Sequence, residues 1–573
     1  MLTRRHFVAQ LTTAAGTGLA LGANPLVAAT GTPASATGTV AVPPAPGWLD
    51  VRAFGARGDG ATLDTAALQA AIDACTAAGG GTVFFPAGRF LSGTLTLKNN
   101  VTLHLSPGAT LLGSQDTADY PAKPFGTRDL DVGGFDIWAL LYADGAHNIA
   151  IEGRGLIDGN GKPFRPLAKI QPLDVASGPR PRGIFLKDSH RVTLRDFSHR
   201  NSGLWAVHLA RCEQVALDNL RLHSEHFVQQ DGIIIDSSRD VRVSNCSIHT
   251  IDDALVFKSS YPVPSENIAV TNCVLTCESS AIKFGTQSLG GFRNIAISNC
   301  ALHNCRLGGL KFEAIDGGTL EDVTVSNIAM FEVSAPLFFK LNNRARDFGH
   351  PEIPQPQPIG RLRNIVITGL RSRLTPKETF YTGGAVNPAE RRGLPYRTAN
   401  TVIIAGLPGH PIENVSISDV HFTFAGGGIA AESERFDIPE EEKRYPENDM
   451  FGILPCWGFY LRHARSITLN NVRLDLLSPD ARSVLVADDV TDLEINGLKT
   501  AGGAKHCVRL RAARDVRIHH SRLLERTTHF LDVQGGARCS VVLVGNDLRL
   551  AATPVTLHQD SAPDAVVQQG NVT

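Results

Sequence analysis

The sequence lacks an excess of either charge. Its 55 lysines and arginines face 56 aspartates and glutamates, so the formal net charge is −1. A chain this close to neutrality has no general electrostatic attraction for nucleic acid or for an anionic membrane surface. It also lacks a convincing apolar run of membrane-spanning length, which takes about 20 residues. We therefore expect neither nucleic acid nor a membrane among its partners.

Cysteine pairs of the kind that bind zinc are absent as well. None of the ten cysteines belongs to a CxxC pair with zinc spacing, and we expect neither a metal nor a cofactor. Cys246, Cys273 and Cys300 each follow an asparagine, at equal intervals. We interpret them as small core residues that stack on one another, not as parts of a disulfide framework.

The N-terminal 30 residues resemble a bacterial export signal. Arg4 and Arg5 form a twin-arginine pair, a mildly apolar run follows, and Val27-Ala28-Ala29 offers a small-residue cleavage site. We predict a signal at 1–30, a Thr/Ala/Pro/Gly-rich linker at 31–47 and a folded domain at 48–573. The protein would then be periplasmic or secreted. The alternative is an ordinary N-terminus that happens to contain Arg-Arg.

A short phrase recurs along the domain. It reads Asn or Asp, then apolar residues alternating with others, then a second Asn followed by an apolar residue or Cys. Clear copies span 240–246, 267–273 and 294–300. Later copies begin at Asp322, Asn364, Asn414, Ser466, Asp492 and Asp515. The spacing is about 23–28 residues, except between about 328 and 466, where it nearly doubles. A self-similar period of this size is typical of a solenoid.

The phrase predicts the fold class. Its alternation is that of a strand, and no helix-length periodic segment separates the copies, which argues against leucine-rich and helical repeats. Abundant glycine and frequent β-branched residues favour short strands joined by turns. We predict an all-β domain, a right-handed single-stranded parallel β-helix. One column of amides should form a ladder, made of Asn219, Asn245, Asn272, Asn299 and Asn327.

Two further features complete the predicted architecture. A short helix at 64–72, with Asp64 as its capping residue, should cover the N-terminal end of the solenoid. The stretches at 330–362, 371–413 and 421–465 exceed one coil, and we interpret them as insertions on the face that binds ligand. Large insertions can block one end of a cleft, which favours exo-cleavage of a polymer.

Three aspartates are the leading candidates for chemistry. Asp231 and the pair Asp252-Asp253 each precede an apolar run, one coil apart. Stacked coils would place them about 5 Å apart, the spacing of neighbouring strands. Crowded carboxylates push one pKa upward, which gives an acid beside bases, as glycosidic hydrolysis requires. The alternatives for a lone Asp-Asp pair are a solvated turn or a calcium site.

At these residues the sequence resembles family 28 glycoside hydrolases, the polygalacturonase and rhamnogalacturonase group. The family's Asn-Thr-Asp motif corresponds to Gln229-Gln230-Asp231, and its Gly-Asp-Asp motif to Ile251-Asp252-Asp253. The resemblance extends to the segments 54–60, 80–88 and 201–208. It implies that Asp252 is the general acid, that Asp231 and Asp253 activate water, and that the reaction inverts configuration. His208 and Trp205 would then contact substrate.

Two motifs depart from the family pattern. The family's Gly-His-Gly corresponds to Ser279-Ser280-Ala281, which places Ser280 where the histidine would stand. Its Arg-Ile-Lys, which holds the uronate carboxylate, corresponds to Lys311-Phe312-Glu313. These changes argue against plain homogalacturonan as the substrate.

The expected coil register adds further substrate-binding candidates. It stacks Val256, Lys283 and Lys311 in one outward column, and Lys258 with Glu313 in the next. We predict that these lysines and Glu313 bind substrate. A salt-bridged ladder on the solenoid surface is the alternative, above all for Lys258 and Glu313.

A later aromatic and basic segment, which begins with Tyr445-Pro446-Glu447, offers more contacts. Within 457–463, Tyr460, Arg462 and His463 could meet a sugar ring or its hydroxyls, whereas Phe459 and Leu461 fit core packing. Core packing where the insertion returns to the β-helix is the alternative for the whole segment.

These observations predict a monomeric glycosidase that acts on a pectic or related plant polysaccharide or oligosaccharide. Two alternatives remain open. A calcium-dependent polysaccharide lyase or uronate epimerase on the same fold would use a lysine base and aspartate-bound calcium. A non-catalytic β-helix that binds glycans would leave the aspartates without a chemical role.

Overall fold

The structure is a computed structural model that describes residues 47–130, 134–161, 180–224, 229–374, 401–501, 505–535 and 539–573. The predicted export signal and all but the last residue of the predicted linker lie outside these residues. So does most of the predicted insertion at 371–413.

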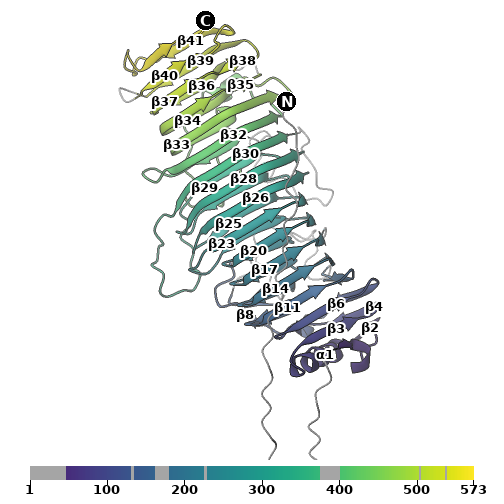
Figure 1. Cartoon of the computed structure of the whole chain (residues 1–573). Coiled ribbons are helices and arrows are strands. Elements are labelled where there is room, and N and C mark those ends of the chain that lie inside the picture. Colours follow the sequence, from purple (N-terminus) through teal and green to yellow (C-terminus); the bar gives the residue numbers. More distant parts are fainter. Residues whose placement is uncertain are drawn as a thin grey trace, which may run out of the picture. The chain divides into compact units, whose positions relative to one another are not determined.

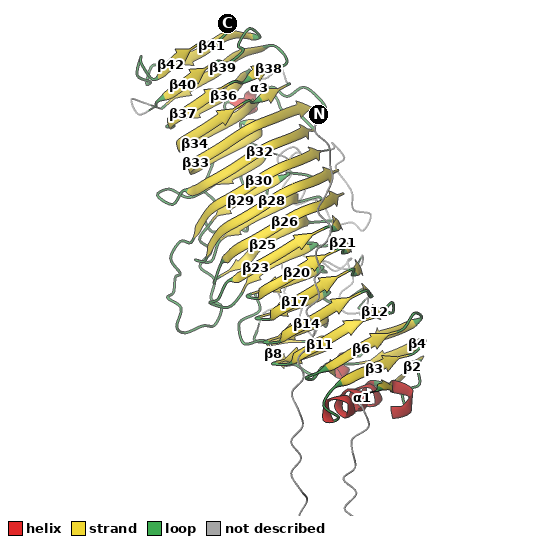
Figure 2. Ribbon diagram, viewed as in Figure 1, coloured by secondary structure: helices red, strands yellow, loops and turns green. Residues whose placement is uncertain are grey.

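The domain is a right-handed parallel β-helix, as predicted. Its strands stack in chain order from the helix α1 (Thr65–Ala77) toward the C-terminal coils (Figure 1). Among the described residues, forty strands belong to one sheet, in which strands pair in parallel with the corresponding strands of the next coil. Figure 2 shows how little helix interrupts this stack.

Each coil has three faces. The first face consists of β5 (Leu95–Thr96), β10 (Ala139–Asp144), β13 (Arg182–Lys187), β16 (Val207–Ala210), β19 (Ile233–Asp236), β22 (Leu255–Ser259), β25 (Ser280–Ser288), β27 (Gly308–Ala314), β29 (Leu337–Leu341), β31 (Val402–Ala405), the first parts of β33 (Cys456–Leu476) and β34 (Ser483–Asn496), β36 (His506–Arg511), β39 (Thr527–Gln534) and β41 (Ala551–Leu557).

The second face carries the recurring phrase. It consists of β1 (Trp48–Asp50), β3 (Gly81–Phe85), β6 (Val101–Leu105), β11 (His147–Glu152), β14 (His190–Arg195), β17 (Glu213–Asp218), β20 (Arg239–Ser244), β23 (Ser265–Thr271), β26 (Phe292–His303), β28 (Thr319–Phe331), β30 (Arg361–Arg373), β32 (Ile412–Phe424), the later parts of β33 and β34, β37 (Arg514–His519), β40 (Val541–Val544) and β42 (Val566–Gln569).

The third face is short-stranded. It consists of β2 (Asp59–Leu63), β4 (Gly88–Ser92), β7 (Ala109–Gly113), β12 (Leu156–Asp158), β15 (Ser198–Arg200), β18 (Arg221–His223), β21 (Ser247–Thr250), β24 (Val274–Cys277), the ends of several long second-face strands, β35 (Lys499–Thr500) and β38 (Arg522–Leu523). Outside the main sheet lie the hairpin β8 (Lys123–Pro124) and β9 (Asp136–Ile137), the 3-10 turns η1 (Val51–Phe54) and η2 (Thr117–Asp119), and the short helix α3 (Ala430–Ser433).

The two asparagines of the phrase mark the two corners of the second face. Asn267 and Asn272, for example, have φ values of 57° and 55°, in the left-handed region. Asparagine tolerates this conformation better than most residues with a side chain, which explains why it recurs there. At the first corner Asn294 Nδ2 donates to Asn267 Oδ1 at 2.7 Å, and Asn267 Nδ2 donates to Asp240 Oδ1 at 2.9 Å.

The predicted amide ladder at the second corner is interrupted. Asn272 Nδ2 donates to Asn245 Oδ1 at 3.5 Å and Asn327 Nδ2 to Asn299 Oδ1 at 2.8 Å. Between them, Asn299 Nδ2 lies 3.5 Å from the Thr271 hydroxyl instead of the next amide. Hydroxyl groups at the ends of neighbouring strands therefore also accept hydrogen bonds from this column of asparagine amides.

The interior is built from stacked identical side chains. Cys246, Cys273 and Cys300 are buried free thiols, as the sequence predicts. The rings of Phe257, Phe284, Phe312 and Phe339 stack through four successive coils of the first face, with centroid separations of 4.5, 5.2 and 4.5 Å. Inward residues in register thus form a continuous core.

The predicted N-terminal helix is present as α1, and it buries Leu68, Ala71, Ile72 and Cys75. Asp64 is the N-cap residue of α1, as predicted, but its side chain makes no capping hydrogen bond. Its carboxylate accepts hydrogen bonds from the backbone N–H groups of Arg57 and Gly58, at 2.8 and 2.9 Å, instead of capping the helix. In the part of the chain that the structure describes, neither α1 nor any other helix has the length and apolar character that a membrane span needs.

Replacing Phe284 with alanine tests the stacked core. Phe284 is fully buried between two other rings, so Phe284→Ala should lower the free energy of unfolding by about 3–5 kcal/mol. Phe331 on β28 is 53% exposed, and Phe331→Ala should change it by less than about 0.5 kcal/mol. Denaturant unfolding of both variants measures the two changes in the free energy of unfolding. Equal losses in Phe284→Ala and Phe331→Ala would contradict the stacked core.

Candidate active site

The three predicted aspartates meet at the start of the first-face strands. Asp231 precedes β19, and Asp252 and Asp253 precede β22. Ile233 pairs with Leu255, and the Gly232 N–H donates to the Asp253 carbonyl at 3.0 Å. Asp231 and Asp253 therefore occupy matching positions on successive coils, as the predicted register requires.

Asp252 is held by backbone donors. Its Oδ2 accepts from the Gln229 N–H at 2.8 Å and its Oδ1 from the Asp253 N–H at 2.9 Å. Burial, followed by the negative charge of Asp253, raises the pKa of Asp252 to about 6, although Lys283 and the two backbone donors oppose the shift. Asp252 can therefore hold a proton at a pH where an ordinary aspartate has lost it.

Asp253 has the opposite surroundings. Its Oδ1 accepts from the Ser279 hydroxyl at 2.7 Å and the Ser280 N–H at 2.8 Å, and its Oδ2 from Lys283 Nζ at 3.1 Å. Burial disfavours the charge, but Lys283, Lys311 and these donors outweigh it and lower the pKa of Asp253 below its ordinary value. Two neighbouring carboxyls thus have pKa values displaced in opposite directions.

The two predicted lysines lie in one outward column, in the predicted register. Val256 pairs with Lys283, and Lys283 with Lys311. Both side chains are buried and both are ion-paired, Lys283 with Asp253 and Lys311 with Glu447. Lys283 Nζ also donates to the Tyr445 hydroxyl at 3.0 Å.

Glu313 lies beside these lysines in the interior of the site. It is fully buried, and neither carboxyl oxygen has a hydrogen-bond partner among the described residues. Burial raises its pKa to about 7 in spite of the positive charges of Lys283 and Lys311. A buried carboxyl with no donor is most stable in its protonated form near neutrality.

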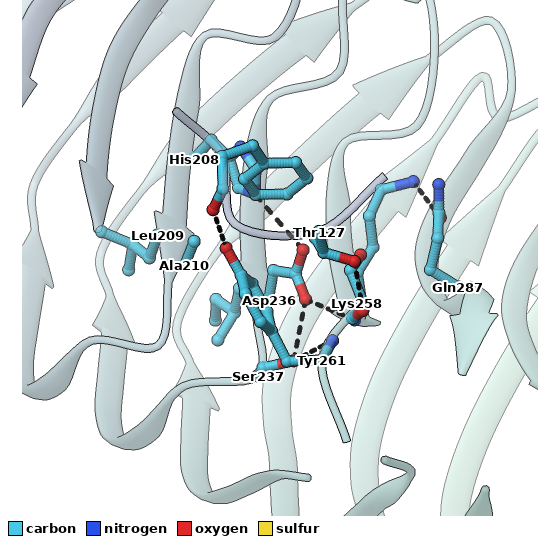
Figure 3. Close-up of polar contacts among 12 residues, drawn as sticks. Thr127, His208, Leu209, Ala210, Asp236, Ser237, Lys258, Tyr261 and Gln287 are labelled. Carbon is cyan, nitrogen blue, oxygen red and sulfur yellow. Dashed lines mark hydrogen bonds and ion pairs between the residues drawn. The ribbon is translucent and has the colours of Figure 1, made fainter. Parts of the chain in front are cut away.

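The predicted pairing of Lys258 with Glu313 in one column is not formed. Between Phe257 and Ser259, β22 has one residue, whereas β25 has three between the paired positions Phe284 and Ser288. The two extra residues bring Gln287 to Lys258, and Lys258 Nζ donates to Gln287 Oε1 at 2.7 Å (Figure 3).

Trp205 and His208, predicted to contact substrate, are both buried (3% and 0% exposed). His208 Nε2 lies 3.5 Å from Asp236 Oδ2, and burial lowers the pKa of His208 to about 4, so the ring is neutral. The ring of Phe125 packs edge-on against His208, with centroids 5.5 Å apart, and Thr127 of the same segment lies beside Lys258 (Figure 3). His208 therefore lies behind the surface and cannot reach a bound sugar in this conformation.

Tyr460, Arg462 and His463, which the sequence predicts to bind substrate, lie on a different coil from the aspartates. They belong to β33, five strand steps from β22 on the first face, or roughly 24 Å at 4.8 Å per step. Tyr460 is buried, and Arg462 and His463 both pair with Glu440. These side chains anchor the segment that precedes β33 to the solenoid.

Several residues that sequence reasoning did not select support the aspartates. Arg180 donates to the Gln229 side chain at 2.6 Å and so braces the residue whose N–H holds Asp252. Ser279 donates directly to Asp253. Tyr445 and Glu447 reach the site from the segment between β32 and β33, where the sequence offered both the excess length of the insertion and its aromatic character as signals.

Three segments cover the first face around the aspartates. Thr127 Oγ1 bonds the carbonyls of Ser260 and Phe348, each at 3.0 Å, so the stretch at 120–130 meets the stretch at 346–350. Asn342, four residues before the second stretch, donates through Nδ2 to the carbonyls of Glu441 and Arg444 in the third stretch, at 438–451. The cover is thus continuous on this side of the face.

Comparison with known proteins adds an independent finding. The model of glycosyl hydrolases family 28 matches residues 75–372, more than half of the chain. An exo-poly-alpha-D-galacturonosidase of Dickeya chrysanthemi is 42% identical over 131 residues, 22% of this chain and 21% of that protein. A probable polygalacturonase of Vitis vinifera is 30% identical over 216 residues, 36% of this chain and 43% of that protein. The matches therefore span less than half the length of these relatives.

Solved structures share the fold. The family 28 exopolygalacturonase of Yersinia enterocolitica superposes with a TM-score of 0.53 at 21% identity, over 82% of this chain and 78% of that chain. The sequence match extends through the coils that carry Asp231, Asp252 and Asp253. The chain belongs to the glycosyl hydrolases of family 28.

Proposed function

We propose that this protein is a glycoside hydrolase that cleaves a pectic or related plant polysaccharide or oligosaccharide. The observation that carries the proposal is the pair Asp252 and Asp253. The pKa of Asp252 is raised and the pKa of Asp253 is lowered. Acid–base cleavage of a glycosidic bond requires such a pair, in which one carboxyl donates a proton and the other accepts one.

In this proposal Asp252 protonates the leaving glycosidic oxygen. Asp253 and Asp231 take a proton from the attacking water, which enters from the opposite side of the sugar ring, so the anomeric configuration inverts. The ionised state of Asp253 supports the role of base, because the contacts with Ser279, Ser280 and Lys283 stabilise its charge.

The covering segments support cleavage from a chain end. The linked segments at 120–130, 346–350 and 438–451 limit how far a polymer can extend along the first face on one side of the aspartates. A polymer that cannot run through the site must present an end to it. We therefore propose exo-action.

The chemistry of Lys283 and Lys311 disfavours a lyase or an epimerase. Either enzyme needs a neutral base near the substrate. Lys283 is paired with Asp253, and its pKa is raised well above the ordinary value, although burial opposes the shift. Lys311 is paired with Glu447. Neither lysine is suited to accept a proton.

Replacing Asp252 with asparagine should abolish the proton donor. Asp252→Asn is expected to lower kcat by at least about a hundredfold on a panel of pectic oligosaccharides with acidic and methyl-esterified uronates. The measurement is chromatography of released sugars, which also reports whether single units leave the chain end. Asp492→Asn, an exposed aspartate on β34, should leave the rate unchanged. Full activity of Asp252→Asn would refute the assigned role.

The pH dependence of kcat/KM should follow the two aspartates. Asp252 must be protonated, so the rate should fall as pH rises through about 6, by about tenfold per further pH unit. Asp253 must be ionised, and its lowered pKa places the acid limb below the ordinary aspartate value of 3.8. Lys283 favours the ionised form of both groups, so Lys283→Met should move both limbs to higher pH. A rate that is independent of pH well above 6 would contradict this assignment.

A further inference from the structure

The two lysines next to the aspartates already have carboxylate partners from the chain itself. Lys283 and Lys311 of the first face have partner carboxylates in Asp253, which precedes β22, and in Glu447, which reaches them from the segment between β32 and β33. Two positive charges meet two negative charges, so the four side chains are electrically balanced before any substrate arrives. The lysine side chains are 3% and 0% exposed, which leaves almost no surface for a bound anion.

The segment that delivers Glu447 is firmly held. The Tyr445 hydroxyl accepts from Lys283 Nζ, and the guanidinium of Arg344 lies over the Tyr445 ring, 5.2 Å from its centre. One residue beyond Glu447, Asn448 Nδ2 donates to the Leu307 carbonyl at 2.7 Å. Contacts on both sides of Glu447 thus fix its carboxylate against Lys311.

We propose that Tyr445 and Glu447 set the specificity of this subsite, and that the sugar unit bound there is uncharged, such as a neutral sugar or a uronate whose carboxyl is esterified. This inference rests on the proposed function and names its substrate class. The carboxylate of Glu447 stands where a uronate carboxylate would otherwise pair with Lys311, so an acidic sugar would compete with the chain for the same cation.

The behaviour of Glu313 supports this assignment. Glu313 is a third carboxyl beside the same two lysines, and its two oxygens have no hydrogen-bond partner among the described residues. Burial and the charges of Glu447 and Asp253 raise its pKa to about 7, against the pull of both lysines. Burial is the largest cause of this rise, and a substrate carboxylate brought against these buried lysines would meet the same cost of burial.

The test uses one oligosaccharide in two charge states. A galacturonate trimer and its fully methyl-esterified form share one backbone and differ at each uronate by one charge and one methyl group, so their binding to Asp252→Asn by calorimetry reports the charge preference of the site without turnover. We expect the ester to bind at least about tenfold more tightly, equivalent to about 1.4 kcal/mol. Preference for the acid, or no binding of either trimer, would overturn the inference; an acid preference would point to Arg344 as the operative cation.

A second variant identifies the residue responsible. Glu447→Gln, made in the same Asp252→Asn background, releases Lys311 and should shift the ester-to-acid binding ratio toward the acid by about tenfold. Glu434→Gln is the matched control, because Glu434 belongs to the same segment but pairs with Lys505 and Arg509 on distant coils. An unchanged ratio in Glu447→Gln would overturn the inference.

Failure of the proposed function gives a different result. If the ester binds preferentially but the wild-type protein releases no sugar from either trimer, the subsite assignment holds and the hydrolase proposal fails. If the wild-type protein cleaves the acid more efficiently and Glu447→Gln changes nothing, hydrolysis holds and the subsite assignment fails.

Discussion

The parallel hydrogen-bonded register between successive coils is the constraint on which the site depends. Side chains with the same place in the coil stack about 4.8 Å apart, so a residue's neighbours are set by coil number and not by distance along the chain. This is how Asp231 comes to lie beside Asp253, and Lys283 beside Lys311. A slip of one residue would turn these side chains into the core, which the stacked phenylalanines forbid.

Register alone does not give the aspartates different chemistry. Asp252 and Asp253 are adjacent in sequence, yet Asp253 receives two polar contacts from Ser279 and Ser280 and a lysine from the next coil. Asp252 receives two backbone donors and has the charged Asp253 as its neighbour. The coil that follows the pair thus determines which carboxyl keeps its proton.

Much of this could be predicted from the sequence, because the repeating phrase fixes both the strand and its register. The fold, the column Val256, Lys283 and Lys311, and the matching places of Asp231 and Asp253 follow from aligning the copies. The expected column of Lys258 and Glu313 could not be placed correctly, because β25 contains two extra residues that the recurring phrase does not reveal.

The contacts that the insertions make could not be predicted from the sequence, because the path of an insertion over the first face follows no repeat. The burial of His208 beneath Phe125, and the arrival of Glu447 at Lys311, both depend on segments that leave the solenoid and return. The pairing of Arg462 and His463 with Glu440 could not be predicted for the same reason, because Glu440 lies in such a segment.

The stereochemistry of cleavage is the most direct measure of the central claim, that Asp252 acts as acid while Asp253 and Asp231 activate water across the sugar ring. Proton NMR of the sugar released in the first moments of reaction, before mutarotation, reports the anomeric configuration of the new reducing end. The account predicts inversion. Retention would contradict it, because retention requires one of these carboxylates to attack the sugar as a nucleophile and form a covalent intermediate.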